Sequence, residues 1–585
     1  MGGVQWIQKR FCFLLRKRCA LRAIARTCSQ HSSSSSTSTV NLEHRRRART
    51  AIPPDGLDLR HFMAVPARNQ QAKIIPSVAE SDTYLSKEDY FGEGRKVKFV
   101  TYGCQMNIND METVRSILFA NGYVETDDER MADIVLLMTC SIREGAEGKV
   151  WRMLKRLRRK GAKRQTIGVL GCMAERVRHR LLTDENAVDI VAGPDSYRDL
   201  PRLLAVTRTG HSAINVQLSL EETYADVSPV RVDSAAKSAF VSIMRGCDNM
   251  CTYCIVPFTR GRERSRPLRS IVEEVKRLSD QGCKQVVLLG QNVNSYRDTS
   301  EISYASSGVD NVGLSPGFKT VYRPKKGGLS FLTLLERVSN VDPEMRIRFT
   351  SPHPKDFPIQ VLELIKDRVN ICNQIHLPAQ SGSNAVLETM GRGYTRESYL
   401  ALVHQIRQLI PDVSLTSDFI AGFCGESEND HKETLDLIRH VKYSFCYVFP
   451  YSMREKTKAS YRLKDDVPEN VKRRRHEELA QVFREEALKT NTALIGSVQL
   501  VLIESQSKRS STAVSGRADG GTKVVVENCE VDGCDESRQL RPGDYVAVEI
   551  KEANSQTLIG RALRRTTLQE FANERFRIGR LADVL

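Results

Sequence analysis

A short cysteine-rich loop constrains the fold of this chain more than any other feature of its sequence. Cys247, Cys251 and Cys254 follow one another in a C-x3-C-x2-C pattern. No second cysteine pair follows at the spacing that a zinc ribbon needs. Three thiolates on one short loop can hold three corners of a [4Fe–4S] cube and leave the fourth iron open to a chelating ligand. The loop therefore predicts an iron–sulfur cluster with one free coordination position.

Strand-like and helical segments alternate along the chain from this loop onward. We expect six strands, at residues 240–244, 285–289, 346–350, 374–377, 414–419 and 447–449. The alternation predicts an incomplete (β/α)6 barrel, whose site lies at the carboxyl ends of the strands. Residues 297–328, rich in Ser, Gly and Lys, indicate an insertion within it. Polar or glycine-containing groups at the strand ends are candidates for lining a cofactor and substrate pocket, although each is also compatible with ordinary loop chemistry: Gly290, Gln291, Asn292, Gln380 and Ser381.

Three further cysteines each follow a predicted strand in the preceding part of the chain. These strands are expected at 97–102, 134–138 and 166–170, with helices at 110–121 and 144–159 between them, and the cysteines are Cys104, Cys140 and Cys172. Alternating strands and helices predict a parallel sheet with right-handed crossovers. Ligands bind at the carboxyl ends of such strands, so the three thiols are expected to converge on an iron–sulfur cluster or on zinc. The alternative is three buried cysteines that act as small apolar residues.

The composition excludes several classes of protein. A chain of 585 residues is too long for a lone binding module. No stretch approaches the ~18–20 uncharged apolar residues of a membrane span. Fifteen cysteines are too few for a disulfide scaffold of this length. The net charge of +17 favours an anionic partner, most often nucleic acid. A stretch at 149–164 with nine Lys or Arg and no acid suggests phosphate contacts, or else an ordinary solvated helix face.

The two ends of the chain differ from its middle. Residues 1–42 contain seven basic residues, a Ser/Thr tract and no acid, which is typical of an organelle transit peptide, or else of a solvated basic tail. Residues 43–93 read as a linker. A helix at 470–493 precedes short strands at 498–503, 522–526 and 545–550, which predict a small antiparallel barrel that binds nucleic acid or serves as a structural cap. Residues 568–585 read as a tail.

Several short sequence motifs resemble those of a known family. They are TYGCQMN at 101–107, TCSIRE at 139–144, LGCMAE at 170–175, RGC at 245–247 and LPAQSGS at 377–383. With the cysteine loop, they make residues 95–567 resemble the radical S-adenosylmethionine (SAM) tRNA methylthiotransferases of the MiaB type, most closely the animal mitochondrial branch. The word SGR at 515–517 resembles the TRAM domain, a tRNA-binding module. Met138 and Cys424 depart from the usual bacterial pattern, and neither is a cluster ligand.

The resemblance implies a set of domains and cofactors. The implied domains are a methylthiotransferase N-terminal domain at 94–210, a radical SAM core at 233–465, a linking helix at 466–492 and a TRAM domain at 493–567. Cys104, Cys140 and Cys172 would hold an auxiliary [4Fe–4S] cluster. The loop cysteines would hold a second [4Fe–4S] cluster that cleaves SAM to a 5′-deoxyadenosyl radical, with the polar strand-end residues forming the SAM pocket.

The resemblance also implies a reaction and partners. The reaction is methylthio insertion at C2 of N6-isopentenyladenosine 37 in the anticodon arm of mitochondrial tRNA, in the matrix and without membrane insertion. An electron donor such as a ferredoxin or a flavoprotein is implied, and a kinase-activator protein is a further partner. The alternatives are threonylcarbamoyladenosine or a ribosomal protein side chain as the target, or a kinase-regulatory protein with degenerate clusters.

Overall fold

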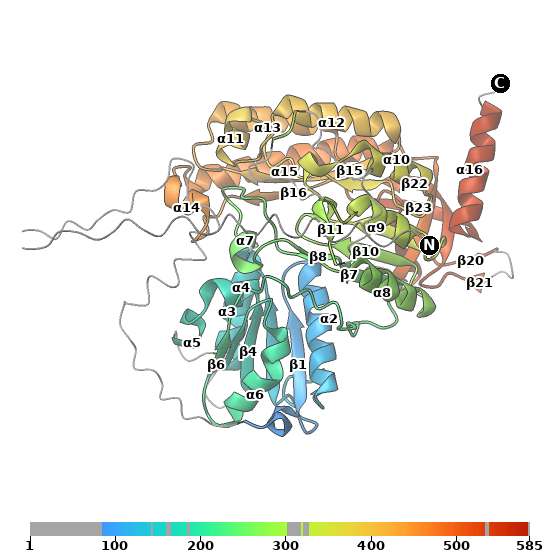
Figure 1. Cartoon of the computed structure of the whole chain (residues 1–585). Helices are drawn as coiled ribbons and strands as arrows, with labels where there is room; N and C mark the ends of the chain where they lie inside the picture. Colours follow the sequence, from blue (N-terminus) through green and yellow to red (C-terminus); the bar gives the residue numbers. More distant parts are fainter. Residues whose placement is uncertain are drawn as a thin grey trace, which may run out of the picture. The chain divides into compact units, whose positions relative to one another are not determined.

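The computed structural model describes residues 85–141, 144–158, 165–183, 188–300, 317–319, 327–532 and 538–582 (Figure 1). The expected transit peptide, most of the expected linker and most of the expected insertion at 297–328 lie outside these ranges. Within them, no helix is both long enough and apolar enough to cross a membrane.

The first part of the chain forms a six-stranded parallel sheet in the order β2-β1-β3-β4-β5-β6. Its strands are β1 (Lys96–Thr101), β2 (Val124–Glu125), β3 (Ile134–Thr139), β4 (Thr166–Gly171), β5 (Ile190–Ala192) and β6 (Ala213–Asn215). Its helices are α2 (Gln105–Ala120), α3 (Glu144–Leu157), α4 (Cys172–Val177), α5 (Arg180–Thr183) and α6 (Leu200–Arg208). Strand β3 is buried along its whole length, as expected for a central parallel strand with an apolar core on each face. The predicted parallel sheet is confirmed.

The central part forms the predicted incomplete barrel. Its six strands are β7 (Ser238–Ser242), β10 (Gln285–Leu289), β13 (Arg346–Phe349), β14 (Gln374–His376), β15 (Ser414–Ala421) and β16 (Phe445–Pro450). They form two parallel three-stranded sheets, linked by a bridge between Ile347 and Ile371. The main covering helices are α8 (Leu268–Asp280), α9 (Phe331–Ser339), α10 (Ile359–Asp367), α12 (Arg396–Leu409) and α13 (Glu428–Val441). The strand order β7-β10-β13-β14-β15-β16 follows the chain, as the alternating pattern predicted.

The two faces of the barrel strands have different partners. Residues such as Val241, Leu288 and Phe419 point to the outer face and pack with the helices in one large apolar core. Alternate residues point to the opposite face, which we call the inner face. There, Phe240, Val287 and Leu289 contact Met106 and Cys104 of the first sheet's domain.

The last part closes into a five-stranded barrel. Its strands are β17 (Val498–Gln506), β18 (Ala513–Ala518), β19 (Lys523–Glu527), β22 (Tyr545–Ala553) and β23 (Thr557–Thr566). The predicted antiparallel barrel is confirmed with one exception, because β19 and β23 pair in parallel. An odd number of strands cannot close a ring with every neighbour antiparallel. Strands β18 and β23 are missing from the prediction, because Gly516 and Gly560 interrupt their patterns. Both glycines lie against neighbouring strands, where a Cβ atom would clash.

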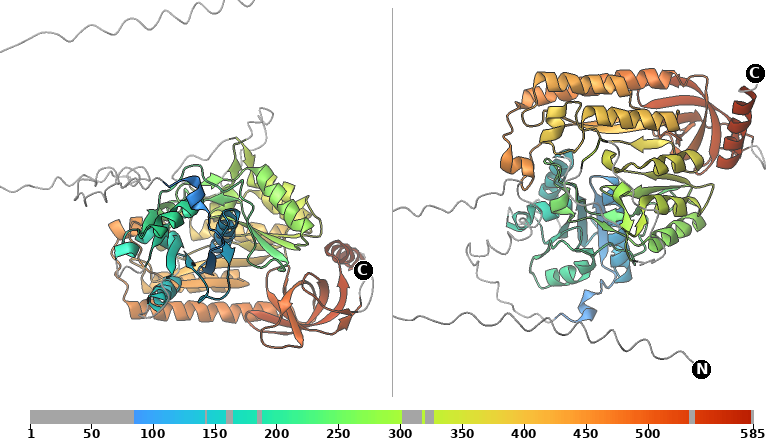
Figure 2. Two further views of the ribbon diagram at one scale, coloured as in Figure 1. Left: turned by 90° about the horizontal axis from the view of Figure 1, so that it is seen from below. Right: turned by 45° about the horizontal axis from the view of Figure 1, so that its top comes forward.

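Helices flank the C-terminal barrel on both sides in sequence. Figure 2 shows α15 (Glu469–Thr492) as a long helix that leads into this barrel. The segment interpreted as a tail instead contains helix α16 (Leu568–Ala582). Glu344 accepts the backbone N–H of Leu568 at 2.7 Å, which ties the start of α16 to the central barrel.

Two buried arginines at the start of β13 attach the C-terminal barrel to the central one. The Arg346 guanidinium donates to the carbonyl oxygens of Arg517 and Leu500 at 2.8 and 2.7 Å. The Arg348 guanidinium donates to those of Asp519 and Ala518 at 2.8 and 2.9 Å. These contacts lie at the amino ends of the strands, whereas the loop with Cys247 follows the carboxyl end of β7. The C-terminal barrel therefore covers the end opposite the cysteine loop.

We expect Arg346→Met to loosen this attachment, because it removes two charge-assisted hydrogen bonds to carbonyl groups of the C-terminal barrel at a total cost of about 3 kcal/mol. Hydrogen exchange in β17 and β18 should accelerate, and the urea midpoint should fall. The exposed Arg337 of α9 is the matched control, and Arg337→Met should change neither quantity. Equal exchange in both variants would contradict this account of the attachment.

Candidate metal centres at the junction of the two sheets

The three cysteines of the first domain lie at the ends of adjacent strands. Cys104 caps α2 after β1, Cys140 follows β3, and Cys172 begins α4 after β4. Gly103, at φ +121°, approaches Cys140 so closely that a Cβ atom would lie 2.7 Å from the Cβ of Cys140. The side chains of Cys104 and Cys140 are hydrogen-bonded. The structure thus brings Cys104 and Cys140 together, and Cys172 lies near enough that the charge of Cys104 adds to burial in raising its pKa.

The cysteine loop folds back on itself after β7. Gly246, at φ +74°, lies against the backbone of Arg262, where a Cβ atom would come within 2.0 Å of the carbonyl oxygen. The backbone N–H of Cys247 donates to Gly261, and that of Cys254 donates to Cys251 at 3.0 Å. Helix α7 (Val256–Thr259) follows at once. Glycine is therefore required before Cys247 so that the returning chain can pass.

An ion-pair network joins the two cysteine groups. Asp110 of α2 is fully buried and accepts hydrogen bonds from Arg245 at 2.8 Å and from Arg260 at 2.7 Å. Arg260 also donates through Nε to the Cys172 sulfur at 3.2 Å. Burial alone raises the pKa of Asp110, but the two arginines outweigh it and hold the pKa below its ordinary value. Arg245 precedes the loop and Arg260 follows it, so this carboxylate fixes the loop beside the first sheet.

A third arginine, Arg392, contacts the cysteine loop directly. Arg392 donates through Nη1 to the Cys251 sulfur at 3.4 Å and through Nη2 to the carbonyl oxygen of Pro378 at 2.8 Å. The loop backbone is also bound there, because Thr252 donates its N–H to Met390 and its hydroxyl to Thr389. Each cysteine group thus has one buried guanidinium within hydrogen-bonding distance of a sulfur.

The electrostatics of the thiols fit cluster ligands. Burial and, to a smaller extent, the negative charge of Cys254 raise the pKa of Cys247 well above its ordinary value. Burial and, to a smaller extent, the negative charge of Cys251 raise the pKa of Cys254 to about 12. A hydrogen bond with Cys140 lowers the pKa of Cys104 to about 6. Neighbouring buried thiolates repel one another, and a cationic iron core would compensate that charge.

The geometry does not suit a single ion. Among the described residues, no group of three or more His, Cys, Asp or Glu side chains is placed to hold one metal ion. In an iron–sulfur cube each thiolate binds a different iron, so the sulfurs need not converge on one point. Soft thiolate donors in two sets of three fit a cluster in each set, and that assignment stays a prediction.

The first three residues predicted for the cofactor pocket form one turn after β10. Gly290 packs against Met244, just before the cysteine loop, and a Cβ atom there would lie 2.6 Å from the Met244 side chain. Buried side-chain oxygens of Gln291 and Asn292 have no hydrogen-bond partner in the described structure. Unpartnered buried oxygens next to this loop are compatible with a ligand role.

Gln380 and Ser381, the other two predicted pocket residues, lie after β14. Gln380 has φ +71°, an uncommon backbone conformation for a side chain of this size, and its N–H donates to the carbonyl oxygen of Asp418. The Ser381 hydroxyl is already bonded to Thr434 and to the N–H of Ser383. Ser381 therefore serves the local turn, and a cofactor role for either residue stays a prediction.

The residues that link the sites are absent from the sequence prediction. Asp110, Arg245, Arg260 and Arg392 lie outside the cysteine pattern or serve only as flanking letters. These residues come close to the loop cysteines and to one another only because the first domain packs against the central barrel. Arg245 and Arg260, on either side of the cysteine loop, were the signal in the sequence that could have predicted this network. Buried cations beside thiolates need an acidic partner, which the structure shows to be Asp110.

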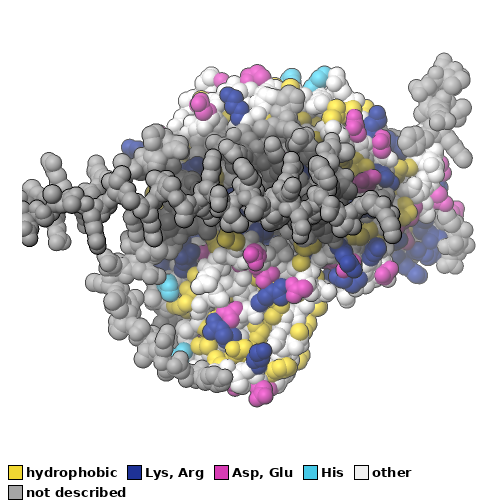
Figure 3. All heavy atoms as spheres, in the orientation of Figure 1, with side chains coloured by type: hydrophobic (Ala, Val, Ile, Leu, Met, Phe, Trp, Pro, Cys, Tyr) yellow, Lys and Arg dark blue, Asp and Glu magenta, His cyan; other side chains and the backbone are white. Residues whose placement is uncertain are grey.

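The basic stretch at 149–164, which we call the basic stripe, is only partly available for phosphate contacts. Within its described part, Arg156 pairs with Glu129 at 2.6 Å and Arg158 with Asp189 at 2.5 Å, whereas Lys149, Arg152 and Lys155 are exposed. Residues 159–164 lie outside the described ranges. On the face drawn in Figure 3, Lys and Arg side chains alternate with Asp and Glu side chains over the first domain. Part of the stripe is therefore an ordinary paired surface.

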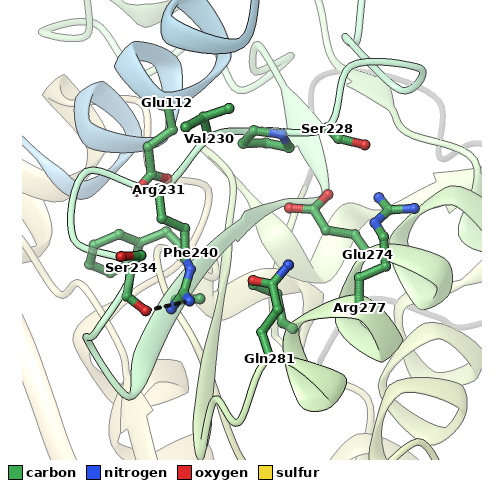
Figure 4. A pocket seen from close by; sticks show the side chains of 12 residues that line it. Glu112, Ser228, Val230, Arg231, Ser234, Phe240, Glu274, Arg277 and Gln281 are labelled. Carbon is green, nitrogen blue, oxygen red and sulfur yellow. Dashed lines mark hydrogen bonds between the residues drawn. The ribbon is translucent and has the colours of Figure 1, made fainter. Parts of the chain in front are cut away.

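A separate cavity of about 570 Å³ lies between α2, α8 and the chain segment before β7 (Figure 4). No cysteine lines it. Glu112, Arg231, Glu274 and Arg277 contribute its charged side chains. Burial, together with repulsion by Glu274, raises the pKa of Glu112 to about 7.

Comparison with known proteins bears on these sites. Residues 96–193 match "Uncharacterized protein family UPF0004", residues 241–438 the radical SAM superfamily and residues 493–563 the TRAM domain. The chain is 62% identical over 518 residues to "CDK5RAP1-like protein" of Caenorhabditis elegans, covering 88% of this chain and 93% of that one. It is 54% identical to "Mitochondrial tRNA methylthiotransferase CDK5RAP1" of Homo sapiens, covering 93% and 95%. It is 46% identical to "tRNA-2-methylthio-N(6)-dimethylallyladenosine synthase" of Chloroherpeton thalassium, covering 80% and 96%.

The pKa of Glu112 predicts a dependence of stability on pH. An acid whose pKa is raised on folding binds more protons in the folded state. The contribution of Glu112 to the free energy of unfolding is therefore full below its unfolded pKa of about 4.5 and is lost as the pH rises to about 7. Glu112→Gln should remove that loss and make the protein more stable than wild type at pH 8, by up to about 3 kcal/mol, with little difference at pH 4.5. Thermal melts at both pH values measure it. If the change in stability between pH 4.5 and pH 8 were the same in Glu112→Gln as in wild type, the raised pKa of Glu112 would be contradicted.

Proposed function

Because the chain belongs to the family of radical SAM tRNA methylthiotransferases, we propose that it inserts a methylthio group at C2 of N6-isopentenyladenosine 37 in mitochondrial tRNA. The observation that carries the proposal is the junction of the two cysteine groups, which Asp110, Arg245 and Arg260 hold together. Methylthiolation at an unactivated C–H bond needs both radical generation and sulfur delivery at one place. The alternatives, a threonylcarbamoyl substrate, a protein target or a purely kinase-regulatory role, are not favoured.

An iron–sulfur cluster and SAM are the cofactors of the radical SAM superfamily, to which residues 241–438 belong. Two [4Fe–4S] clusters belong to the proposal: Cys247, Cys251 and Cys254 would hold one, and Cys104, Cys140 and Cys172 the auxiliary one. When bound, the first supplies the electron that cleaves SAM, and the second supplies the sulfur. The polar turn with Gln291 and Asn292, next to the cysteine loop, is our candidate for SAM binding.

The chain's own residues place and insulate the two centres. Burial raises the pKa of Cys172, and the Arg260 guanidinium, which donates to its sulfur, acts in the opposite direction and favours the thiolate. Arg392 provides the corresponding cation at Cys251. Most of the six cysteines are buried, so water is largely excluded from the junction.

The substrate partner is tRNA, and its binding is proposed to use the C-terminal barrel as well as the junction. The barrel covers the amino ends of the central strands, and an eight-residue strand such as β15 rises roughly 25 Å. The barrel would therefore contact tRNA at a distance from nucleotide 37, through exposed cations such as Lys523 and Arg561. Arg561 would exchange its ion pair with Glu549 for a phosphate contact. The domain divisions at 94–210, 233–465, 466–492 and 493–567 follow the same proposal.

The compartment is the mitochondrion, as for the mitochondrial relatives, and the matrix is our proposal because tRNA is used there. An electron donor such as a ferredoxin or flavoprotein is proposed because SAM cleavage consumes an electron. A kinase-activator protein stays a proposal from family resemblance.

We expect the reconstituted protein to bind about eight iron atoms, four for each cluster. Alanine at Cys247, Cys251 and Cys254 should remove about half of the iron and abolish SAM cleavage. Alanine at Cys104, Cys140 and Cys172 should also leave about four iron atoms, with SAM cleavage retained and no methylthio product. Cys529→Ala, at an exposed cysteine, is the control and should leave both readouts unchanged.

Nucleoside mass spectrometry tests the substrate. In knockout cells the methylthio form should disappear from mitochondrial tRNA and the isopentenyl precursor should accumulate. A change in threonylcarbamoyladenosine derivatives instead would overturn the proposed substrate, and methylthio product from the second triple variant would overturn the role of the first domain.

The Lys523→Gln and Arg561→Gln variants should each weaken tRNA binding uniformly and reduce the slope of log affinity against log salt by about one, because each removes a phosphate contact. Binding titrations from low to high salt measure this. Lys366→Gln, at an exposed lysine of α10, is the matched control and should behave as wild type. Unchanged slopes in both barrel variants would return the barrel to a structural role.

A further inference from the structure

Half of the central barrel's inner face carries polar and aromatic residues. The register of β14, β15 and β16 pairs His376 with Thr416 and Asp418 with Tyr447. Paired and alternate residues point to the same side of a sheet, so all four share the inner face, while Leu415 and Phe419 between them pack into the outer core. In Figure 1, helices α12 and α13 lie along the other side of these strands.

These side chains form a connected and accessible surface. The His376 ring bonds through Nδ1 to the Thr416 hydroxyl at 2.9 Å, and its Nε2 lies 3.4 Å from the Asp418 carboxylate. The His376 and Asp418 side chains are 18% and 30% exposed. Tyr447 is 47% exposed, and its ring is nearly parallel to that of Phe449, at 12° and 6.2 Å between centroids. An accessible aromatic pair beside a carboxylate is unusual inside a barrel, whose interior is ordinarily packed.

The row is held in place from one end. Phe445, two residues before Tyr447 on the same face, packs against Phe483 of α15 with ring centroids 5.4 Å apart. The aromatic row therefore has an anchored end and an exposed end, and the exposed end lies beside Asp418.

A short series of contacts connects this surface to the cysteine loop. The N–H of Gln380 donates to the backbone carbonyl oxygen of Asp418. Pro378, two residues before Gln380, accepts from the same Arg392 guanidinium that contacts the Cys251 sulfur. The remaining half of the inner face, on β7 and β10, contacts Met106 and Cys104. A molecule on the β14–β16 half would thus have one cysteine group beside it and the other across the barrel.

We propose that His376, Thr416, Asp418, Tyr447 and Phe449 form the recognition surface for the prenylated base and that Asp418 rejects N6 substituents that carry a carboxylate. This inference rests on the proposed function, because it takes N6-isopentenyladenosine as the substrate. It adds the residues that read the N6 substituent.

The chemistry of the base matches this surface. An aromatic side chain gives a stacking platform for a base turned out of its loop, and it also suits the five-carbon prenyl chain. Asp418 can accept the N6–H, the donor that prenylation leaves on the base. A threonylcarbamoyl group adds a carboxylate at N6, which a neighbouring carboxylate disfavours through like-charge repulsion. His376 is a positioning residue, since it touches both Thr416 and Asp418.

Binding to short RNAs tests the surface without turnover. The probes are three anticodon stem–loops that differ only at position 37, carrying adenosine, N6-isopentenyladenosine or N6-threonylcarbamoyladenosine. Dissociation constants are measured for the protein with its clusters reconstituted. Tyr447→Ala should reduce the preference for isopentenyl over unmodified RNA about tenfold. Unmodified RNA should be weakened less, because it loses only the stacking of its base. Asp418→Asn should tighten binding of the threonylcarbamoyl RNA about tenfold and change isopentenyl binding less.

Controls separate recognition from folding. Phe91→Ala removes an exposed aromatic ring on the first domain and should keep every ratio at the wild-type value. Iron content and melting temperature should match wild type in each variant, and Tyr447→Phe should retain the isopentenyl preference.

The outcomes distinguish this inference from the proposed function. If wild type prefers the isopentenyl RNA and Tyr447→Ala and Asp418→Asn keep all its ratios, the recognition surface is overturned while the proposed substrate stands. If wild type shows no preference for the isopentenyl RNA, the proposed substrate is overturned, and the inference with it.

Discussion

One buried carboxylate between two buried arginines is the interaction on which the rest of the structure depends. Asp110 comes from the first helix after Cys104, whereas Arg245 and Arg260 flank the cysteine loop. Breaking a buried ion pair by removing one partner costs about 3–5 kcal/mol, because it leaves an uncompensated charge. The first domain therefore cannot slide along the central barrel without that cost. The spacing of the two cysteine groups is thus set by the chain's own side chains.

The central barrel separates two tasks between its ends. Its carboxyl ends carry the cysteine loop and face the first domain, while its amino ends are covered by the C-terminal barrel through Arg346 and Arg348. Backbone carbonyl groups accept these hydrogen bonds, and two side chains of the C-terminal barrel add to the attachment. Tyr545 donates to the carbonyl oxygens of Lys284 and Glu344, and Asp519 accepts the N–H of Asn373. The exposed side chains of this barrel remain available for another partner.

Much of the fold follows from local patterns that the sequence displays directly. Strand β3 is an uninterrupted apolar run, and such a run is expected wherever a parallel strand is buried on both faces. The placement of Cys104, Cys140 and Cys172 along one edge was also predictable, because a parallel sheet carries the carboxyl ends of all its strands on the same edge. Strands β18 and β23 were missed because Gly516 and Gly560 break the alternation, and they are glycine only because neighbouring strands approach there.

By itself the sequence determined most of the strands and where each cysteine stands relative to its strand, since these depend on short-range periodicity and spacing. It also named six cysteines as candidate ligands for soft metals. Tertiary structure alone decided that Arg260 reaches Cys172, that Arg346 reaches a carbonyl of another barrel, and that Asp418 shares a face with Tyr447. The first two contacts join residues far apart in the chain. The third depends on strand register, because a shift of one residue would turn Asp418 or Tyr447 to the opposite face of the sheet.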